Sequence, residues 1–356
     1  MATYYIGFDV HCEFTEMAVV SSSGKFVQRH RCKTDIPHLL KALELVARPR
    51  RLTFEEGPMA GWLHRNLASH VDKLVVCNPR RNHLIAKDSD KDDPIDAEKL
   101  AQLFRGGYLK EVHQSDNQAR AFFKQHVALY HDHVRQRVRE ANVIMAQFRR
   151  HGVFVHESAF LDSTDRPALR NRLPNGSLLW DDLELLFEGY DLAWKHQLTM
   201  HDRLVALARK EEPIRRFVEV PGFAWVRAAT FYAYVDTPWR FKSKSALWRY
   251  LGIGLEREHS GNGRTIVRVS QGSNRVLRGI MIGAAKTVIQ AAKASDPFYQ
   301  QHQHWMEDGL SARNARRNVA RSLAATLWGM WKNGNAYRPD WVARGAWTDE
   351  RLVSSK

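Results

Sequence analysis

The first regular element of the chain is the stretch Tyr4-Tyr5-Ile6-Gly7-Phe8-Asp9-Val10, whose aromatic and β-branched residues predict a β-strand. A second apolar run at residues 16–20 is followed by a polar link that contains a glycine, and a third run spans residues 26–30. Such a link between two strand-like runs predicts a hairpin. The chain is therefore expected to begin with an antiparallel meander of three strands.

The apolar period then changes from strand-like to helical. A helix is predicted by apolar residues at i, i+3, i+4 and i+7 spacing, namely Ile36, Leu39, Leu40, Leu43 and Val46. Short strands are predicted at residues 51–55 and 73–77, each followed by a helix, the second of which covers residues 95–104. The order βββαβαβα is that of the ribonuclease H fold, so residues 1–112 are expected to form an α/β domain of this type.

Four carboxylates occupy positions that this fold brings together. Asp9 lies within the first apolar strand, where a charge is costly unless a partner binds it. Glu55 ends the fourth strand run, and Asp93 and Asp96 are one helical turn apart. Clustered carboxylates stay ionised only beside cations, and hard oxygen ligands select Mg²⁺ or Mn²⁺. Two such ions about 4 Å apart can hold a scissile phosphate, so these residues are candidates for a catalytic metal site.

Individual members of this set also have explanations in ordinary structure. Asp93 precedes Pro94 and would serve equally well as a helix N-cap, while Asp96 would suit a solvated helix face. Glu56 is adjacent to Glu55, so either glutamate is a candidate for the end of the fourth strand. The metal interpretation is favoured because the carboxylates are expected to act together.

The composition is that of a basic globular protein. Its 356 residues are more than one hydrophobic core usually serves, so two or three domains are expected. The net charge is +15, and the stretch from Ile214 to Arg321 holds 18 Lys and Arg against 7 Asp and Glu. An excess of this size attracts polyanions, of which nucleic acid is the commonest.

The cysteines and the apolar runs indicate the compartment. Cys12, Cys32 and Cys77 are scattered and odd in number, which argues against a disulfide framework or a zinc site and fits a reducing cytosol. No apolar run approaches the roughly 20 residues of a membrane span, and the N-terminus does not resemble a secretory signal. The protein is therefore expected to be cytoplasmic, with no membrane partner.

The rest of the chain is predicted to be mainly helical. Residues 113–212 contain two long amphipathic helices, at residues 119–150 and 179–209, which are expected to form a helical hairpin or short coiled coil. Residues 213–340 are expected to form a third domain, and residues 341–356 a polar and loose tail.

The third domain is predicted to begin with a strand-like turn motif, Val218–Ala224. Its Pro221-Gly222 step resembles half of a helix-hairpin-helix, in which backbone N–H groups at a helix start approach a phosphate. A plain turn at the start of a helix explains the step equally well. Long helices are predicted at residues 274–294 and 313–331.

Residues 256–264 form a polar, glycine-rich loop that contains Ser260. A serine can attack phosphorus when a base or a metal removes its proton and cations hold the oxyanion. A serine beside a glycine is also common in ordinary turns, so the loop alone leaves both interpretations open. The candidates for nucleic-acid contacts in and after the loop are Arg264, Arg268, Arg275 and Arg278.

In combination, several motifs resemble those of the DEDD-type insertion-sequence transposases, relatives of the pilin-gene invertase. The N-terminal motifs are Gly7-Phe8-Asp9-Val10-His11, Phe54-Glu55-Glu56-Gly57 and the stretch Lys91–Ala101. The C-terminal motifs are Val220-Pro221-Gly222, Leu251-Gly252-Ile253-Gly254, His259-Ser260-Gly261 and the stretch Ser270–Arg278. The likeness covers nearly the whole chain, with one departure at Glu56-Gly57-Pro58, where the family often has a small residue and then Thr-Gly.

This resemblance implies a RuvC-like domain in which Asp9, Glu55, Asp93 and Asp96 bind Mg²⁺. It also implies a C-terminal transposase domain in which Ser260 forms a transient 5′-phosphoserine link with the cut strand. The implied partners are donor and target DNA, a structured bridge RNA that pairs with both, and three further copies of the chain in a tetramer.

The expected function is that of a recombinase that cuts and rejoins DNA without ATP. The first alternative is a RuvC-like junction nuclease that uses a metal-activated water, with Ser260 in a structural role. The second is a non-catalytic basic scaffold for RNA or DNA. A covalent protein–DNA adduct would distinguish the recombinase from the nuclease, and metal-dependent cleavage would exclude the scaffold.

Overall fold

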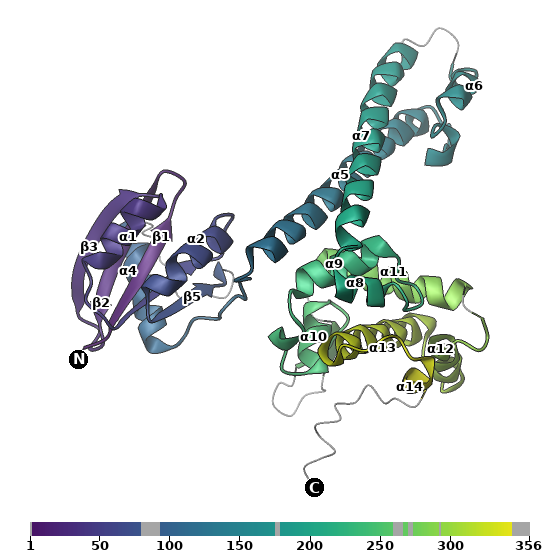
Figure 1. Ribbon diagram of the computed structural model, residues 1–356. Helices are drawn as coiled ribbons and strands as arrows, with labels where there is room; N and C mark the ends of the chain where they lie inside the picture. The colour runs from purple at the N-terminus through teal and green to yellow at the C-terminus, as the bar shows by residue number, and fades with distance from the viewer. Residues whose placement is uncertain are drawn as a thin grey trace. The chain divides into compact units, whose positions relative to one another are not determined.

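The residues described by the computed structural model are 2–79, 93–174, 179–258, 266–269, 273–291 and 293–343 (Figure 1). The chain divides into two compact units, Met1–Ala121 and Phe122–Lys356, and each has its own hydrophobic core. None of the described helices is long and apolar enough to cross a bilayer. The predicted boundary near residue 212, within the second unit, stays a prediction.

A five-stranded sheet forms the centre of the first unit, in the order β3-β2-β1-β4-β5. Its strands are β1 (Tyr4–Val10), β2 (Phe14–Ser21), β3 (Phe26–Lys33), β4 (Arg50–Glu55) and β5 (Lys73–Cys77). β1, β2 and β3 form an antiparallel meander, whereas β4 and β5 run parallel to β1. This mixed α/β arrangement is consistent with the predicted ribonuclease H-like domain.

Helices cover both faces of this sheet. They are α1 (Ile36–Glu44), α2 (Ala60–Leu67), the 3-10 helix η1 (Ala68–His70) and α4 (Asp93–Gly106). Ile6 and Phe8 of β1 are buried in a core to which α1 and α2 contribute. Because side chains alternate along a strand, Gly7 and Asp9 belong to the opposite face, against which α4 packs.

Two long helices of the second unit form a hairpin, as predicted. They are α5 (Gln118–Arg150) and α7 (Leu179–Ala208). The rings of Tyr130 and His201 are 6.2 Å apart, and those of His133 and His196 are 5.6 Å apart. Rising residue numbers on α5 therefore meet falling numbers on α7, so the two helices are antiparallel. Their coiling about one another as a coiled coil stays a prediction.

Short elements close the far end of this hairpin. They are η3 (Glu157–Ala159), η4 (Ser163–Asp165) and α6 (Arg166–Arg170). Phe148 of α5, Phe160 of the connection and Phe187 of α7 are buried in one cluster. The Tyr190 hydroxyl donates to Glu157 at 2.7 Å, which ties the connection to α7.

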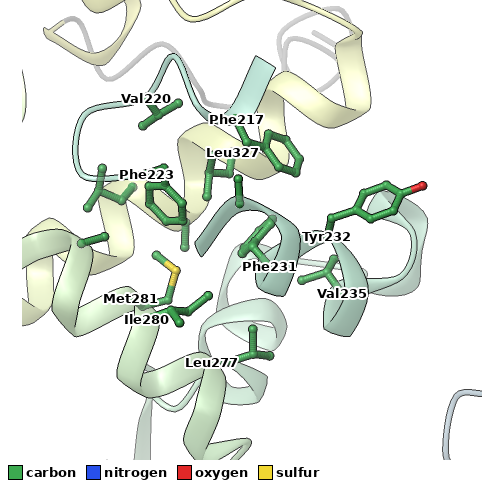
Figure 2. Packing of buried hydrophobic residues seen from close by; sticks show 14 of the residues in the cluster. Phe217, Val220, Phe223, Phe231, Tyr232, Val235, Leu277, Ile280, Met281 and Leu327 are labelled. Atoms are coloured by element: carbon green, nitrogen blue, oxygen red, sulfur yellow. The ribbon is translucent and has the colours of Figure 1, made fainter. Parts of the chain in front are cut away.

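The remainder of the second unit is a helical domain. Its helices are α8 (Glu212–Phe217), α9 (Trp225–Val235), η5 (Pro238–Arg240), α10 (Lys244–Tyr250), α11 (Arg275–Ala291), α12 (Pro297–Glu307), α13 (Ala312–Asn333) and α14 (Pro339–Ala343). α9 packs against α11, and α11 against α13. Figure 2 shows Phe231 of α9, Met281 of α11 and Leu327 of α13 within one apolar cluster.

The predicted strand-like segment at Val218 is wrong. The N–H of Val218 donates to the carbonyl oxygen of Ile214, so Val218 caps α8 and the chain then turns towards α9. The β-branched Val220 does not indicate a strand. Its side chain is buried in the core of the helical domain, where it is only 1% exposed.

Two further expectations for the second unit are also wrong. The predicted polar loop begins inside an antiparallel pair of strands, β6 (Leu255–Glu258) and β7 (Ile266–Val269). The predicted loose tail of residues 341–356 is wrong at its start, because residues 341–343 belong to α14 (Pro339–Ala343), in which Val342 is buried. Residues 344–356 lie outside the described part of the chain.

Candidate functional site

Asp9 and Glu55 lie at the same end of two neighbouring parallel strands. Phe8 of β1 is paired with Phe54 of β4, so the residues that follow them are side by side. Asp9 shares its face of the sheet with Gly7, two residues earlier, and by the same register Glu55 belongs to this face. Both carboxylates are half-buried, and the side chain of Asp9 is 25% exposed.

Glu56, the alternative to Glu55, has a different environment. It follows the last residue of β4 and is exposed, and its N–H donates to the carbonyl oxygen of Cys77 at 2.8 Å. The strand register therefore favours Glu55 as the neighbour of Asp9.

α4 packs against β1 through backbone contact at a glycine. A Cβ atom on Gly7 would lie 2.0 Å from the carbonyl oxygen of Ala97 and 2.8 Å from the nitrogen of Ala101. Nearer the start of β1, the ring of Tyr5 packs edge-on against Phe104, with 5.6 Å between centroids. Later residues of β1 thus meet earlier residues of α4, so this helix runs antiparallel to the strand.

The antiparallel packing brings the N-terminal end of α4 to Asp9. From Tyr5 to Asp9 the strand rises about 13 Å, at about 3.3 Å per residue. From Phe104 back to Asp96 the helix spans about 12 Å, at about 1.5 Å per residue. Asp96 is therefore level with Asp9, and the backbone of Asp93, the first residue of α4, lies about one turn beyond.

The described carboxylates at this end of the sheet have basic neighbours. Nε2 of His11 is 3.1 Å from Oδ2 of Asp9, and Nζ of Lys99 is 4.0 Å from Oδ1 of Asp96. The ammonium of Lys99 offsets part of the negative charge of Asp96. These contacts still leave the two aspartates 25% and 29% exposed, so both are accessible to a ligand.

Glu16 is a further carboxylate at this end of the sheet, and it is not among the residues predicted from the sequence. It is paired with Asp9 across β1 and β2, on the same face of the sheet. Its side chain is only 5% exposed, and Nε of Arg31 lies 3.4 Å from its Oε1. A glutamate inside an apolar run is the same signal that identifies Asp9, but the predicted run began at Glu16 and hid this.

These residues fit a divalent cation by their chemistry. Asp9, Glu55 and Asp96 offer carboxylate oxygens from three adjoining elements, the donor type that Mg²⁺ and Mn²⁺ prefer. Within the described residues, no group of three or more His, Cys, Asp or Glu side chains is arranged to hold a metal ion. The side chain of Asp93 lies outside the described part of the chain.

The predicted site residues of the second unit are described only in part. Ser260 and Arg264 fall in the segment that connects β6 to β7 and lie outside the described residues, as does the side chain of Arg268 in β7. Arg275 and Arg278 are exposed in the first turns of α11.

The Pro221-Gly222 step is explained by packing. Gly222 has a φ of 82°, and a Cβ atom there would lie 2.6 Å from the carbonyl oxygen of Ala284 in α11. Nη1 of Arg227 donates to the carbonyl oxygen of Gly222 at 2.6 Å. The turn thus fits against α11, which favours a plain turn at the start of a helix over a phosphate-binding hairpin.

Comparison with protein families assigns both units to one class of protein. A model of DEDD-type transposases of the IS110 group matches residues 6–152, and a model described as "Transposase IS116/IS110/IS902 family" matches residues 214–300. The fold, the carboxylates and these matches define a DEDD-type transposase. The chain belongs to the IS110/IS116/IS902 family of transposases.

Two curated relatives are similar over part of the chain. The transposase for insertion sequence element IS1111A of Coxiella burnetii is 23% identical over 140 residues, which are 38% of each chain. The putative transposase y4pF/y4sB of Sinorhizobium fredii is 26% identical over 145 residues, 39% of this chain and 36% of the relative. The match thus spans less than two fifths of the length of either relative.

Proposed function

We propose that the protein is a transposase that cuts and rejoins DNA at a site where Asp9, Glu55, Asp93 and Asp96 hold Mg²⁺, with Mn²⁺ as an alternative. The observation that carries this proposal is the packing of α4 on Gly7, which brings the start of that helix to the strand ends that bear Asp9 and Glu55. Membership of a transposase family supports DNA as the substrate.

Each carboxylate has a defined task in this proposal. Asp9 and Glu55 belong to strands that are hydrogen-bonded to each other, so their spacing is fixed by the sheet. Asp96 and Asp93 belong to α4, and in this proposal they complete the ligand set from the helix that covers this face of the sheet. When bound, the cation polarises the scissile phosphate and offsets the charge that develops during cleavage.

We further propose that Ser260 is the nucleophile. Its hydroxyl oxygen attacks the phosphorus and gives up its proton, a new O–P bond forms, and the bond from phosphorus to the 3′ oxygen breaks as that oxygen takes up a proton. The phosphodiester energy is kept in the serine ester, so rejoining by the reverse attack needs no ATP. Arginines that neutralise the phosphate would assist, and the candidates are Arg264, Arg268, Arg275 and Arg278.

A guide RNA and a tetramer belong to the same proposal through the resemblance to the family. A bridge RNA that pairs with donor and target DNA would leave the choice of sequence to base pairing. In a tetramer, the carboxylates of one copy and the serine of another can act on the same strand. Sequencing of nucleic acid that copurifies with the protein, together with its mass in solution, would test both points.

The metal site is tested by charge. Asp9→Asn and Asp96→Asn should each abolish Mg²⁺-dependent strand cleavage while the protein stays folded, because each change removes a ligand oxygen of high charge density. Glu44→Gln, a matched change at an exposed position of α1, should cleave as the wild type does. Normal cleavage by Asp9→Asn would contradict the assignment.

The nucleophile is tested by denaturing electrophoresis of labelled donor and target DNA. Ser260→Ala should keep nucleic-acid binding but lose both recombination and the covalent protein–DNA adduct. Ser158→Ala, at an exposed position of the second unit, serves as the control. If Ser260→Ala still recombines DNA, the serine mechanism is wrong. Cleavage without any adduct in the wild type would instead support the junction nuclease.

A further inference from the structure

α11 and α13 pack against each other in the second unit (Figure 1). A basic groove is lined by residues of both helices. The groove has a volume of about 470 Å³. Six cationic side chains line it, namely Arg275, Arg278, Lys286, Arg313, Arg316 and Arg317. Those of α13 follow i, i+3, i+4 spacing, so they share one helix face. This cavity is termed the α11–α13 groove.

The groove brings six positive charges close together. Within the described part of the chain, none of the six side chains forms an ion pair with a carboxylate. Nη1 of Arg317 donates to Oδ1 of Asn314 at 3.1 Å, which fixes the guanidinium in place. Burial lowers the pKa of Arg317, and the charges of Arg313, Arg278 and Arg316 lower it further. Cations held this close repel one another unless an anion lies between them.

Glycines leave room in the groove for a ligand to approach the backbone of α11. Gly252, Gly279 and Gly283 all line it. A Cβ atom on Gly279 would have no neighbour within 4 Å, so an alanine would fit there. A glycine inside a helix costs about 1 kcal/mol relative to alanine. Packing within the fold therefore gives no reason for Gly279, whereas close approach of a ligand does.

The chemistry of the lining points to phosphates and not to bases. Apart from the cations and glycines, Ile282 is the one remaining side chain among the described residues of the lining. Single-stranded nucleic acid is usually bound by aromatic rings that stack on its bases, and base edges are read by amides or bidentate arginines in a DNA groove. The described residues of the lining include no aromatic or amide side chain, and such a cationic groove suits the phosphates on the outside of a double helix.

We propose that the α11–α13 groove binds the phosphate backbone of duplex DNA without reading its sequence. This inference rests on the proposed function, which supplies DNA as the substrate. It adds four cations to the arginines suggested by the sequence, namely Lys286, Arg313, Arg316 and Arg317. It also assigns a role to Gly279, which keeps the floor of the groove open so that the phosphates can reach the cations on both helices.

The test is the salt dependence of binding to a labelled DNA duplex, measured by fluorescence anisotropy on the full-length protein in EDTA. The variant Arg278→Gln/Lys286→Gln/Arg313→Gln changes three exposed side chains of the groove. Each lost phosphate contact should flatten the slope of log K against log salt by about 0.9, so the three together should change it by about 2.7. At 0.1 M salt the affinity should fall by on the order of a hundredfold.

A matched variant controls for net charge. Lys195→Gln/Arg203→Gln/Lys210→Gln removes three exposed charges from α7 and the residues after it, and should leave the slope close to that of the wild type. Gly279→Glu tests the floor of the groove, because glutamate favours the helix more than glycine does but places a negative charge among the cations. It should weaken DNA binding at least tenfold, and Gly279→Ala, which adds only a methyl group to the floor of the groove, should weaken it by a smaller factor.

Three results would overturn the inference. They are an unchanged slope in the groove variant, an equal change in the α7 control, and a loss of affinity for an RNA duplex while DNA binding is unaffected. Because the assay contains no metal and measures no cleavage, its failure leaves the proposed function standing. Conversely, normal cleavage by Asp9→Asn would refute the metal site without affecting the groove.

Discussion

Replacing Gly7 by alanine should push α4 away from the sheet. The new Cβ atom would lie 2.0 Å from the carbonyl oxygen of Ala97 and 2.8 Å from the nitrogen of Ala101. Non-bonded contacts are normally about 3.5 Å or longer. Both atoms belong to the backbone of one helix, so neither can rotate out of the way. α4 must therefore move away from β1 by about 1.5 Å.

The cost of this retreat follows from the packing. Overpacking a buried contact costs about 1–3 kcal/mol, and a clash of the new Cβ atom with a helix backbone belongs at the upper end, about 3 kcal/mol. Alanine in a strand recovers up to about 1 kcal/mol relative to glycine. The free energy of unfolding should thus fall by about 2 kcal/mol, and the midpoint of thermal unfolding by on the order of 5–10 °C.

The same shift should impair chemistry at the candidate site. Asp96 would move with α4, away from Asp9, and a displacement of about 1 Å at a reacting centre can cost about a hundredfold in rate. Thermal unfolding, amide hydrogen exchange of α4 and DNA cleavage measure the three effects. Gly57→Ala is the matched control for stability, because a Cβ atom there meets nothing within 4 Å. If Gly7→Ala unfolds at the temperature of this control and α4 stays equally protected, the proposed packing is wrong.

The buried Arg50 and the half-buried His131 should also contribute measurably to stability. Arg50→Met should lower the free energy of unfolding, measured in urea titrations, by about 3 kcal/mol. The reason is that two backbone carbonyl oxygens, which accept hydrogen bonds from the Arg50 guanidinium at 2.9 and 3.0 Å, would lose their donor. The same change at the exposed Arg48 should cost far less. Burial, and then the charge of Arg135, lower the pKa of His131 to about 4. The unfolded chain binds this proton near pH 6.5, so stability should fall from about pH 6.5 to pH 4, by about 2 kcal/mol after allowance for partial exposure. The difference between wild type and His131→Asn should show no such fall if the interpretation is wrong.

The elements that the sequence predicts well are those with a strong local period. β1 and β2 are short apolar runs, and the long helices α5 and α7 bury apolar side chains at helical spacing, so both patterns are visible without knowing the partner. β6 and β7 are not predicted from the sequence, because each is only four residues long and its partner strand is separated from it by residues 259–265. For α12 the sequence indicates only where the helix begins, through the N-cap Asp296 and the following Pro297.

The candidate site was predictable as a set of residues but not as a geometry. Asp9 is identified by its place in an apolar strand, and Asp93 and Asp96 by their helical spacing. The neighbour relation between Asp9 and Glu16 depends on strand register, which single-residue patterns do not reveal. The α11–α13 groove likewise needs two helices that are distant in sequence. The excess of basic residues in the stretch Ile214–Arg321 indicates where nucleic acid would bind, but only the packing of α11 on α13 shows which arginines line the same groove.

Packing and the proposed chemistry are coupled in β1, because Gly7 and Asp9 belong to the same face of the strand. Ile6 and Phe8 bury their side chains on one side and contribute to the core, so they hold the strand in place. On the other side, Gly7 sets how closely α4 approaches, and Asp9 receives the start of that helix. A change at Gly7 must therefore lower stability and activity together, whereas Asp9→Asn removes charge from a carboxylate cluster and should lower activity alone. Two substitutions on one strand face thus separate the effect of packing from the proposed role of Asp9 in catalysis.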